Sequence, residues 1–195
     1  MKKSAIIAIL FLFIVSMSTV AFAEETTKPQ IDQSARNVAI IPYINATEET
    51  KGYIQEVVDS KYTEQYSNKN FKMIPLVDVQ QALNNTGYDV SNKELPDKDV
   101  LAAVAKKTNA NYVVAMEISQ LITTRHMSYF QTKVVTKAKL RYKLYNAEQD
   151  KVIPFQVTGL SENKSVFGDV GYKDPITKAL TQAMEAANEK IMSNL

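Results

Sequence analysis

Five positively charged side chains recur along a short segment of the sequence, with apolar side chains between them. The segment runs from Thr132 to Asn146 and reads TKVVTKAKLRYKLYN. Successive side chains of an extended chain point to opposite sides, so this alternation predicts a β-strand with one basic side and one buried apolar side. The cations, which we call the basic row, are Lys133, Lys137, Lys139, Arg141 and Lys143.

The basic row is either a binding surface or the solvent-exposed side of an antiparallel sheet. Alternation of polar and apolar residues is expected in any half-exposed strand. Five cations without an anion, however, repel one another unless a neighbouring strand or a partner supplies carboxylates. We therefore take the row, together with Tyr145 on the same side, as the candidate partner-binding site. Tyr142 falls on the apolar side and is expected in the core.

Three other side chains bear on this site. Glu117 lies in a mostly apolar predicted strand, on the side that also carries Ser119. A buried carboxylate needs a partner, so we expect Glu117 to pair with the basic row rather than to act as a catalytic acid, which would need a second carboxylate nearby. Tyr129 and Phe130 precede the basic strand and could add an aromatic edge for a sugar polymer or a protein.

The sequence lacks most of the residue patterns that carry chemistry. His126 is the only histidine and is expected in a loop, without a second ligand at metal-binding spacing. There is no cysteine, no serine in a G-x-S-x-G motif and no glycine-rich phosphate loop. We therefore expect no enzymatic activity, no cofactor and no metal site.

The amino terminus has the pattern of an export signal. Two lysines precede an uncharged apolar run, and Ala21 and Ala23 stand at the −3 and −1 positions of an A-x-A cleavage site. We expect cleavage after Ala23, a flexible leader over residues 24–36 and one domain over residues 37–195. An uncleaved anchor is the alternative, because the run is just long enough to cross a bilayer.

Charge and composition narrow the possible partners. Cleavage would remove two of the 23 basic side chains and none of the 21 acidic ones, which leaves the mature chain without net charge. Nucleic-acid binding needs a net or strongly clustered positive field, so no nucleic-acid partner is expected. The absence of cysteine predicts a protein without a lipid anchor. The expected location is the periplasm or the cell envelope of a bacterium, with no stable membrane insertion after cleavage.

Periodicity predicts a single α/β domain with a mixed sheet and the element order β-α-β-α-α-β-β-β-α. Asp78 with Gln81 is expected to cap one helix, Pro96-Asp97 to open the next, and Asp174 with Pro175 to start the last. The predicted strands and helices cover residues 38–44, 48–67, 71–74, 78–87, 96–108, 112–122, 132–146, 152–160 and 174–195.

Three segments resemble a known α/β domain superfamily. They read VAIIPYIN, FKMIPLVDVQQALNNTG and DKDVLAAVAKKTNANYVVAMEI, and LRYKLYNAEQDKVIPFQVTG is similar to the hairpin of the same domains. The superfamily includes TolB amino-terminal domains, the curli-secretion lipoproteins of the CsgG type and the LpoB-type activators of penicillin-binding proteins. The resemblance implies a mixed α/β fold and an envelope setting, and it brings no catalytic signature. The chain lacks the long insertions that build membrane hairpins in curli-type pores.

Three classes of function fit these observations. The leading one is a non-enzymatic envelope accessory protein that binds and supports a synthase, a secretion machine or a surface assembly. The second is a soluble periplasmic binding protein for a small ligand or an anionic glycan. The third is a subunit of an oligomeric export complex, against which the missing insertions count.

Overall fold

The computed structural model describes residues 35–64, 66–67, 71–166 and 170–195. They belong to one compact unit, Ser34–Leu195. The predicted signal peptide with Ala21 and Ala23, and all but the end of the predicted leader, lie outside the described residues. The elements are β1 Arg36–Ile40, β2 Ile44–Asn45, α2 Gly52–Glu64, β3 Phe71–Met73, α3 Leu76–Asn84, the 3-10 helix η2 Val90–Asn92, α4 Lys98–Thr108, β4 Tyr112–Met127, β5 Thr132–Asn146, β6 Lys151–Ser165 and α5 Lys173–Met192.

The strands form one mixed sheet, as the sequence predicts. Its order is β3-β1-β4-β5-β6, with β2 also paired to β4. The pairings of β1 with β3 and β4, and of β2 with β4, are parallel, whereas β4, β5 and β6 form an antiparallel meander. The expected order of strands and helices is confirmed, with β2 and η2 as short additions.

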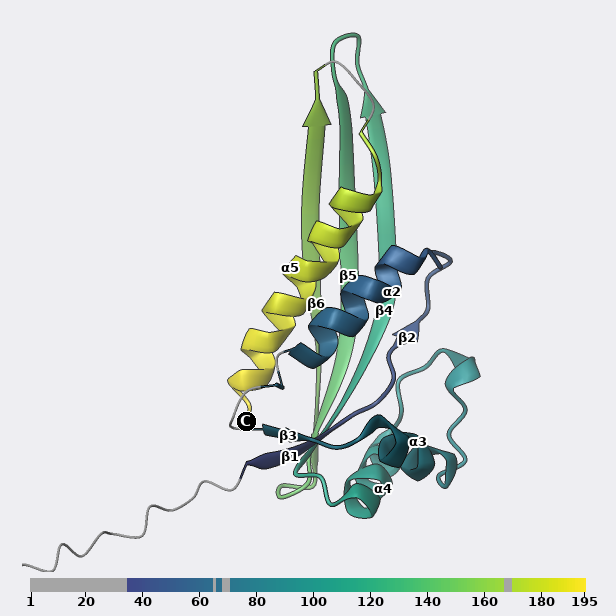
Figure 1. The fold of residues 1–195 in the computed structure, drawn as a ribbon, viewed down its shortest axis with the longest axis vertical. Helices are drawn as coiled ribbons and strands as arrows, with labels where there is room; N and C mark the ends of the chain where they lie inside the picture. The colour runs from purple at the N-terminus through teal and green to yellow at the C-terminus, as the bar shows by residue number, and fades with distance from the viewer. Residues whose placement is uncertain (1–34, 65, 68–70, 167–169) are drawn as a thin grey trace, which may run out of the picture. The chain divides into compact units, whose positions relative to one another are not determined.

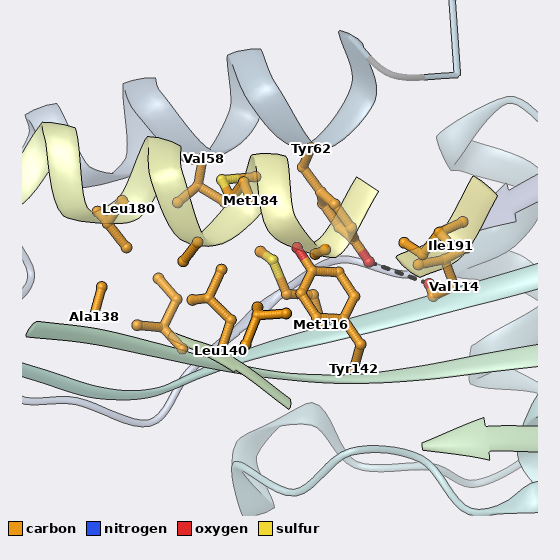
Figure 2. Packing of buried hydrophobic residues seen from close by; sticks show 14 of the residues in the cluster. Val58, Tyr62, Val114, Met116, Ala138, Leu140, Tyr142, Leu180, Met184 and Ile191 are labelled. Carbon is orange, nitrogen blue, oxygen red and sulfur yellow. Dashed lines mark hydrogen bonds between the residues drawn. The ribbon is translucent and has the colours of Figure 1, made fainter. Parts of the chain in front are cut away.

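Helices cover the two sides of the sheet to different extents (Figure 1). On one side, α2 and α5 pack on β4 and β5 through a large apolar cluster that includes Leu140 and Tyr142, both fully buried. Figure 2 shows Tyr62 of α2 in this cluster, where its hydroxyl donates to the Val114 carbonyl at 3.2 Å. On the other side, α3 and α4 pack on β1 and on the first residues of β4 through a smaller cluster. The predicted apolar side of β5 is therefore the side under α2 and α5.

One glycine allows α5 to lie very close to the sheet. A Cβ atom at Gly159 of β6 would stand 1.9 Å from the Ala179 carbonyl oxygen of α5 and 2.8 Å from the Ala183 nitrogen. No side chain fits there, so glycine is required by close backbone approach. The small Ala179 and Ala183 side chains allow the same approach from the helix side.

Side chains of α5 occupy part of the outer edge of β6. The Leu160 N–H donates to Oε1 of Gln182 at 2.7 Å, and Nζ of Lys190 donates to the Gln156 carbonyl at 3.2 Å. Pro154 lies two residues before Gln156, so its backbone nitrogen is also at the outer edge. Proline has no N–H group that could pair with another strand there. Edge strands that are covered or carry proline resist pairing with other chains.

The predicted helix starts are partly confirmed. The Asp97 side chain caps α4 by accepting the Val100 N–H at 2.9 Å. At α3, Pro75 takes the cap position without a side-chain bond, and Asp78 falls in the first turn instead. At α5, the helix begins at Lys173, so Asp174 is also a first-turn residue. Both carboxylates still stabilise their helices, because they lie near the positive end of the helix dipole.

Two strands are longer than predicted. β4 continues to Met127, which places His126 in a strand rather than in a loop, and β6 continues to Ser165 rather than ending at Leu160. These extensions are too polar to be recognised from an apolar pattern, and their pairing with β5 holds them in the sheet. No helix within the described residues is long and apolar enough to cross a membrane.

Candidate docking surface

The basic row lies on the side of β5 that carries α3 and α4, but these helices reach only one end of it. Tyr145 is buried in their cluster, together with Val113 and Ala115 of β4. Further along the same side, Lys137 of β5 and its cross-strand neighbours Ile122 and Leu160 are exposed. Beyond α3 and α4, no helix among the described residues covers this side of the meander of β4, β5 and β6 (Figure 1).

Arg141 is bound to a buried carboxylate. Its Nη2 atom lies 2.6 Å from both carboxylate oxygens of Glu117, which is its cross-strand neighbour on β4. The Glu117 side chain is 1% exposed, whereas that of Arg141 is half exposed. The predicted cross-strand pair is confirmed, and it assigns Arg141 a structural task, because a buried carboxylate without a partner is costly.

Lys143 is held by backbone carbonyls rather than by an acid. Its Nζ donates to the Leu95 carbonyl at 3.2 Å and to the Pro96 carbonyl at 2.8 Å, immediately before α4. The lysine therefore ties the loop that leads into α4 to the sheet. Its charge is not freely presented to a partner.

Lys133, at the other end of the row, shares a carboxylate with a second lysine. Glu162 of β6 lies 2.5 Å from Lys133 Nζ and 2.6 Å from Lys164 Nζ. Hydrogen bonds from these two lysines, Lys133 first, lower the pKa of the Glu162 carboxyl below its ordinary value. The neighbouring strands thus supply two of the carboxylates that the row needs.

Lys137 and Lys139 are the two members of the row whose amino groups make no hydrogen bond or ion pair with a described residue. Lys137 lies between Ile122 of β4 and Leu160 of β6, which are 48% and 60% exposed. Lys139 lies between two polar residues of the same strands. We call these six residues the open face: Gln120, Ile122, Lys137, Lys139, Thr158 and Leu160.

A β-bulge places Ile122 on the open face. The pairing of β4 with β5 shifts between Ile118 and Gln120, and the Ser119 hydroxyl donates to the Lys139 carbonyl at 3.0 Å. Strict alternation would put Ile122 on the side opposite Glu117. The extra residue at Ser119 reverses the sides of the residues that follow it, so Gln120 and Ile122 share the side of Lys139 and Lys137. Sequence reasoning missed Ile122 for this reason, and it missed Leu160 because a single exposed apolar residue is common.

The prediction that Tyr145 lies on the surface is wrong. The ring is 5% exposed, and its hydroxyl donates to Oδ1 of Asp150 at 3.0 Å. Burial, and then the bond to Asp150, raise the pKa of the tyrosine hydroxyl. Lys98 of α4 donates to the same aspartate at 2.7 Å, so Tyr145 belongs to the packing of α4 on the sheet. It shares a side with the basic row, but α3 and α4 cover that end.

An open cavity of about 520 Å³ lies beside Arg141 and Lys143, between the loop before α4 and β6. It offers a place for an anionic ligand, and Gln156 and Glu94 also line it. Both cations are already committed, however, to Glu117 and to two carbonyls. The cavity therefore presents an ion pair and a carboxylate rather than free positive charge.

The other candidates for chemistry remain dispersed. His126 lies exposed on β4, opposite Lys133. Within the described ranges, no group of three or more histidine, aspartate or glutamate side chains could hold a metal ion.

Comparisons with known proteins give matches among solved structures alone. No family model matches the chain, and no curated protein does. The hypothetical protein CT253 from Chlamydia trachomatis is similar, with 16% identity, 82% of this chain and 94% of that chain covered, and a TM-score of 0.49. Lipoprotein GNA1162 from Neisseria meningitidis has 11% identity, coverage of 82% and 99%, and a TM-score of 0.46. The LpoB C-terminal domain from Escherichia coli has 12% identity, coverage of 65% and 82%, and a TM-score of 0.42.

Proposed function

We propose that the chain is an exported, non-enzymatic accessory protein of the bacterial cell envelope, and that its open face binds an acidic protein partner. The observation that carries the proposal is that Lys137 lies between two exposed apolar side chains of the neighbouring strands, Ile122 and Leu160. Exposed apolar side chains can provide contact area for a partner, and the uncommitted cations beside them can steer and orient an acidic one.

Lys137 and Lys139 are the two of the six predicted residues that we propose for docking. Arg141, Lys143 and Tyr145 have partners within the domain, and Lys133 shares Glu162. Docking by Lys137 and Lys139 therefore needs no rearrangement of the sheet. The export signal, which places such a surface outside the cytoplasm, remains a prediction from Ala21 and Ala23.

The alternative of an anionic glycan or small-molecule ligand is less well supported. Its natural place is the cavity beside Arg141, and a ligand there would have to compete with Glu117 for the guanidinium group. Separating the buried Glu117 carboxylate from the Arg141 guanidinium group is expensive. A protein partner on the open face requires no such exchange.

The test is affinity capture from envelope extracts with three forms of the chain beginning at Glu24. The unchanged chain should retain a partner that Lys137→Gln/Lys139→Gln loses, and raised salt should weaken capture because exposed charges are screened. Lys106→Gln/Lys107→Gln on α4, which removes two exposed cations elsewhere, is the matched control and should retain the partner. Identical captured proteins in all three forms would contradict the proposal.

A further inference from the structure

The turn between β4 and β5 carries a group of exposed apolar side chains separate from the open face. Tyr129 is 93% exposed and Phe130 66%, and their rings meet edge to face with centroids 4.8 Å apart. Met127, just before them, and Val166, just after β6, are also exposed. We call these four residues the tip. They lie where the strands of the meander run beyond the helices (Figure 1).

The tip aromatics are not explained by the turn itself. Ser128 and Gln131 exchange backbone hydrogen bonds at 2.8 and 3.4 Å, so Tyr129 and Phe130 are the two residues of a tight hairpin loop. Neither residue has a positive φ, so the loop admits most residue types and gives no reason for two large rings. Two large rings pointing to solvent add nothing to the core, and exposed apolar groups of this kind mark contact sites.

The turn at the opposite end of β5 shows what local folding alone requires. There the Asn146 side chain accepts the Glu148 and Gln149 N–H groups at 3.0 and 3.1 Å, and Asp150 adopts a φ of 48°. Polar residues with these roles are typical of turns. Two turns that end the same strand thus differ in chemistry, and only one of them displays aromatic rings.

The surroundings of the tip are positively charged. Lys133 and Lys164 share the single carboxylate of Glu162, and Nη2 of Arg125 donates to the Val170 carbonyl at 2.7 Å, a contact that leaves its charge in place. Lys173 and Asp174, near Lys164, balance each other, so the described residues around the tip keep an excess of positive charge. Aromatic side chains flanked by cations are typical of protein segments at the interface of an anionic bilayer, where rings enter the headgroup region and cations meet lipid phosphates. The backbone bonds between Ser128 and Gln131 also reduce the cost of entering a region poor in water.

We propose that the tip is a reversible membrane-contact element, which places Tyr129 and Phe130 in the headgroup region of an anionic phospholipid bilayer. The excess of positive charge beside two exposed rings favours an anionic bilayer as the occupant. Two rings and two smaller apolar groups suffice for weak attachment without a membrane-spanning segment. The tip would hold the domain near a bilayer while the open face remains accessible.

The main experiment uses a single tryptophan as a reporter, because the chain contains none. The form beginning at Glu24 includes the whole compact unit Ser34–Leu195 and carries Phe130→Trp. Adding vesicles of phosphatidylglycerol and phosphatidylcholine should shift its emission to shorter wavelength, and brominated lipid should quench it. Val77→Trp is the control, since Val77 is 72% exposed on α3, and its emission should not change.

A second measurement tests the rings by vesicle sedimentation. Tyr129→Ser/Phe130→Ser should lower partitioning about tenfold or more, since both apolar groups are lost. Leu76→Ser/Val77→Ser on α3 removes comparable exposed groups and should leave partitioning unchanged. No emission shift for Phe130→Trp, an equal shift for Val77→Trp, or equal binding to pure phosphatidylcholine vesicles would overturn the proposal. Partner capture by Lys137 and Lys139 should survive the tip variant, so the two proposals can fail independently.

Discussion

The two halves of β5 use the same residue pattern for different purposes. Near Arg141 and Lys143 both sides of the sheet are covered by helices, and the charged groups bind Glu117 or backbone carbonyls. Near Lys137 and Lys139 the described helices cover only one side, and the two amino groups make no hydrogen bond or ion pair with a described residue. An alternating basic strand therefore does not define a binding surface by itself. The packing of helices from elsewhere in the chain decides which cations remain available.

The largest expected effect on stability comes from a substitution on the side of the sheet that α5 covers. Gly159→Ala should destabilise the domain by more than about 3 kcal/mol, because a methyl group would collide with the Ala179 carbonyl and α5 would have to move. Chemical denaturation measures the free energy of unfolding. Thr158→Ala, one residue away on the open face, is the control and should change it by less than about 0.5 kcal/mol. Equal losses would contradict the close packing of α5 on β6.

The next largest effect on stability distinguishes the cations that have partners in the domain from Lys137 and Lys139. Arg141→Ala should cost about 3 kcal/mol, near the lower end for a broken buried pair because water reaches the half-exposed guanidinium site. Replacing both partners, as in Glu117→Leu/Arg141→Leu, should recover much of this loss because no unpaired charge remains. If Arg141→Ala unfolded at the same denaturant concentration as the unchanged protein, the pair would have no structural role.

A much smaller effect on stability is expected from the open face. Lys137→Gln/Lys139→Gln should shift the free energy of unfolding by no more than about 0.5 kcal/mol, because exposed charges without partners contribute little. A thermal melt beside the unchanged protein measures this. A large loss would mean that the two lysines are structural, and the contrast between the halves of β5 would disappear.

The smallest effect concerns pH. The pKa of Glu162 is lowered in the folded protein, so its ionised form favours folding above the ordinary value of 4.5, and this contribution is lost as pH falls through the lower, folded-state pKa. Carboxyl chemical shifts followed by NMR should show titration below 4.5. In Lys133→Gln/Lys164→Gln the pKa should return toward 4.5. An unchanged value would show that the two lysines do not hold this carboxylate.

Local patterns predicted much of the sheet. Alternation along β5 identified the buried side with Leu140 and Tyr142, and the burial of Glu117 in an apolar strand implied a basic partner. These inferences succeeded because each depends on neighbouring residues or on adjacent strands. The helix start at Pro96-Asp97 is equally local and is also confirmed.

Features that depend on distant segments could not be predicted. The coverage of Tyr145 comes from α3 and α4, which lie far from it in sequence, so the strand pattern gave no sign of its burial. The bulge at Ser119 has no signature in composition, yet it decides that Ile122 faces solvent beside Lys137. The candidate site was therefore placed on the correct strand, but its committed and free members could not be separated.

The contacts of Gln182 and Lys190 with the edge of β6 also bear on the order in which the domain is completed. All residues of β6 precede α5, so during synthesis or refolding a formed meander would carry a 15-residue strand edge before its helix arrives. Such an edge is a template for other chains. Loss of α5 should therefore lead to strand pairing between chains and to insoluble protein. The helix thus protects the finished domain from self-association.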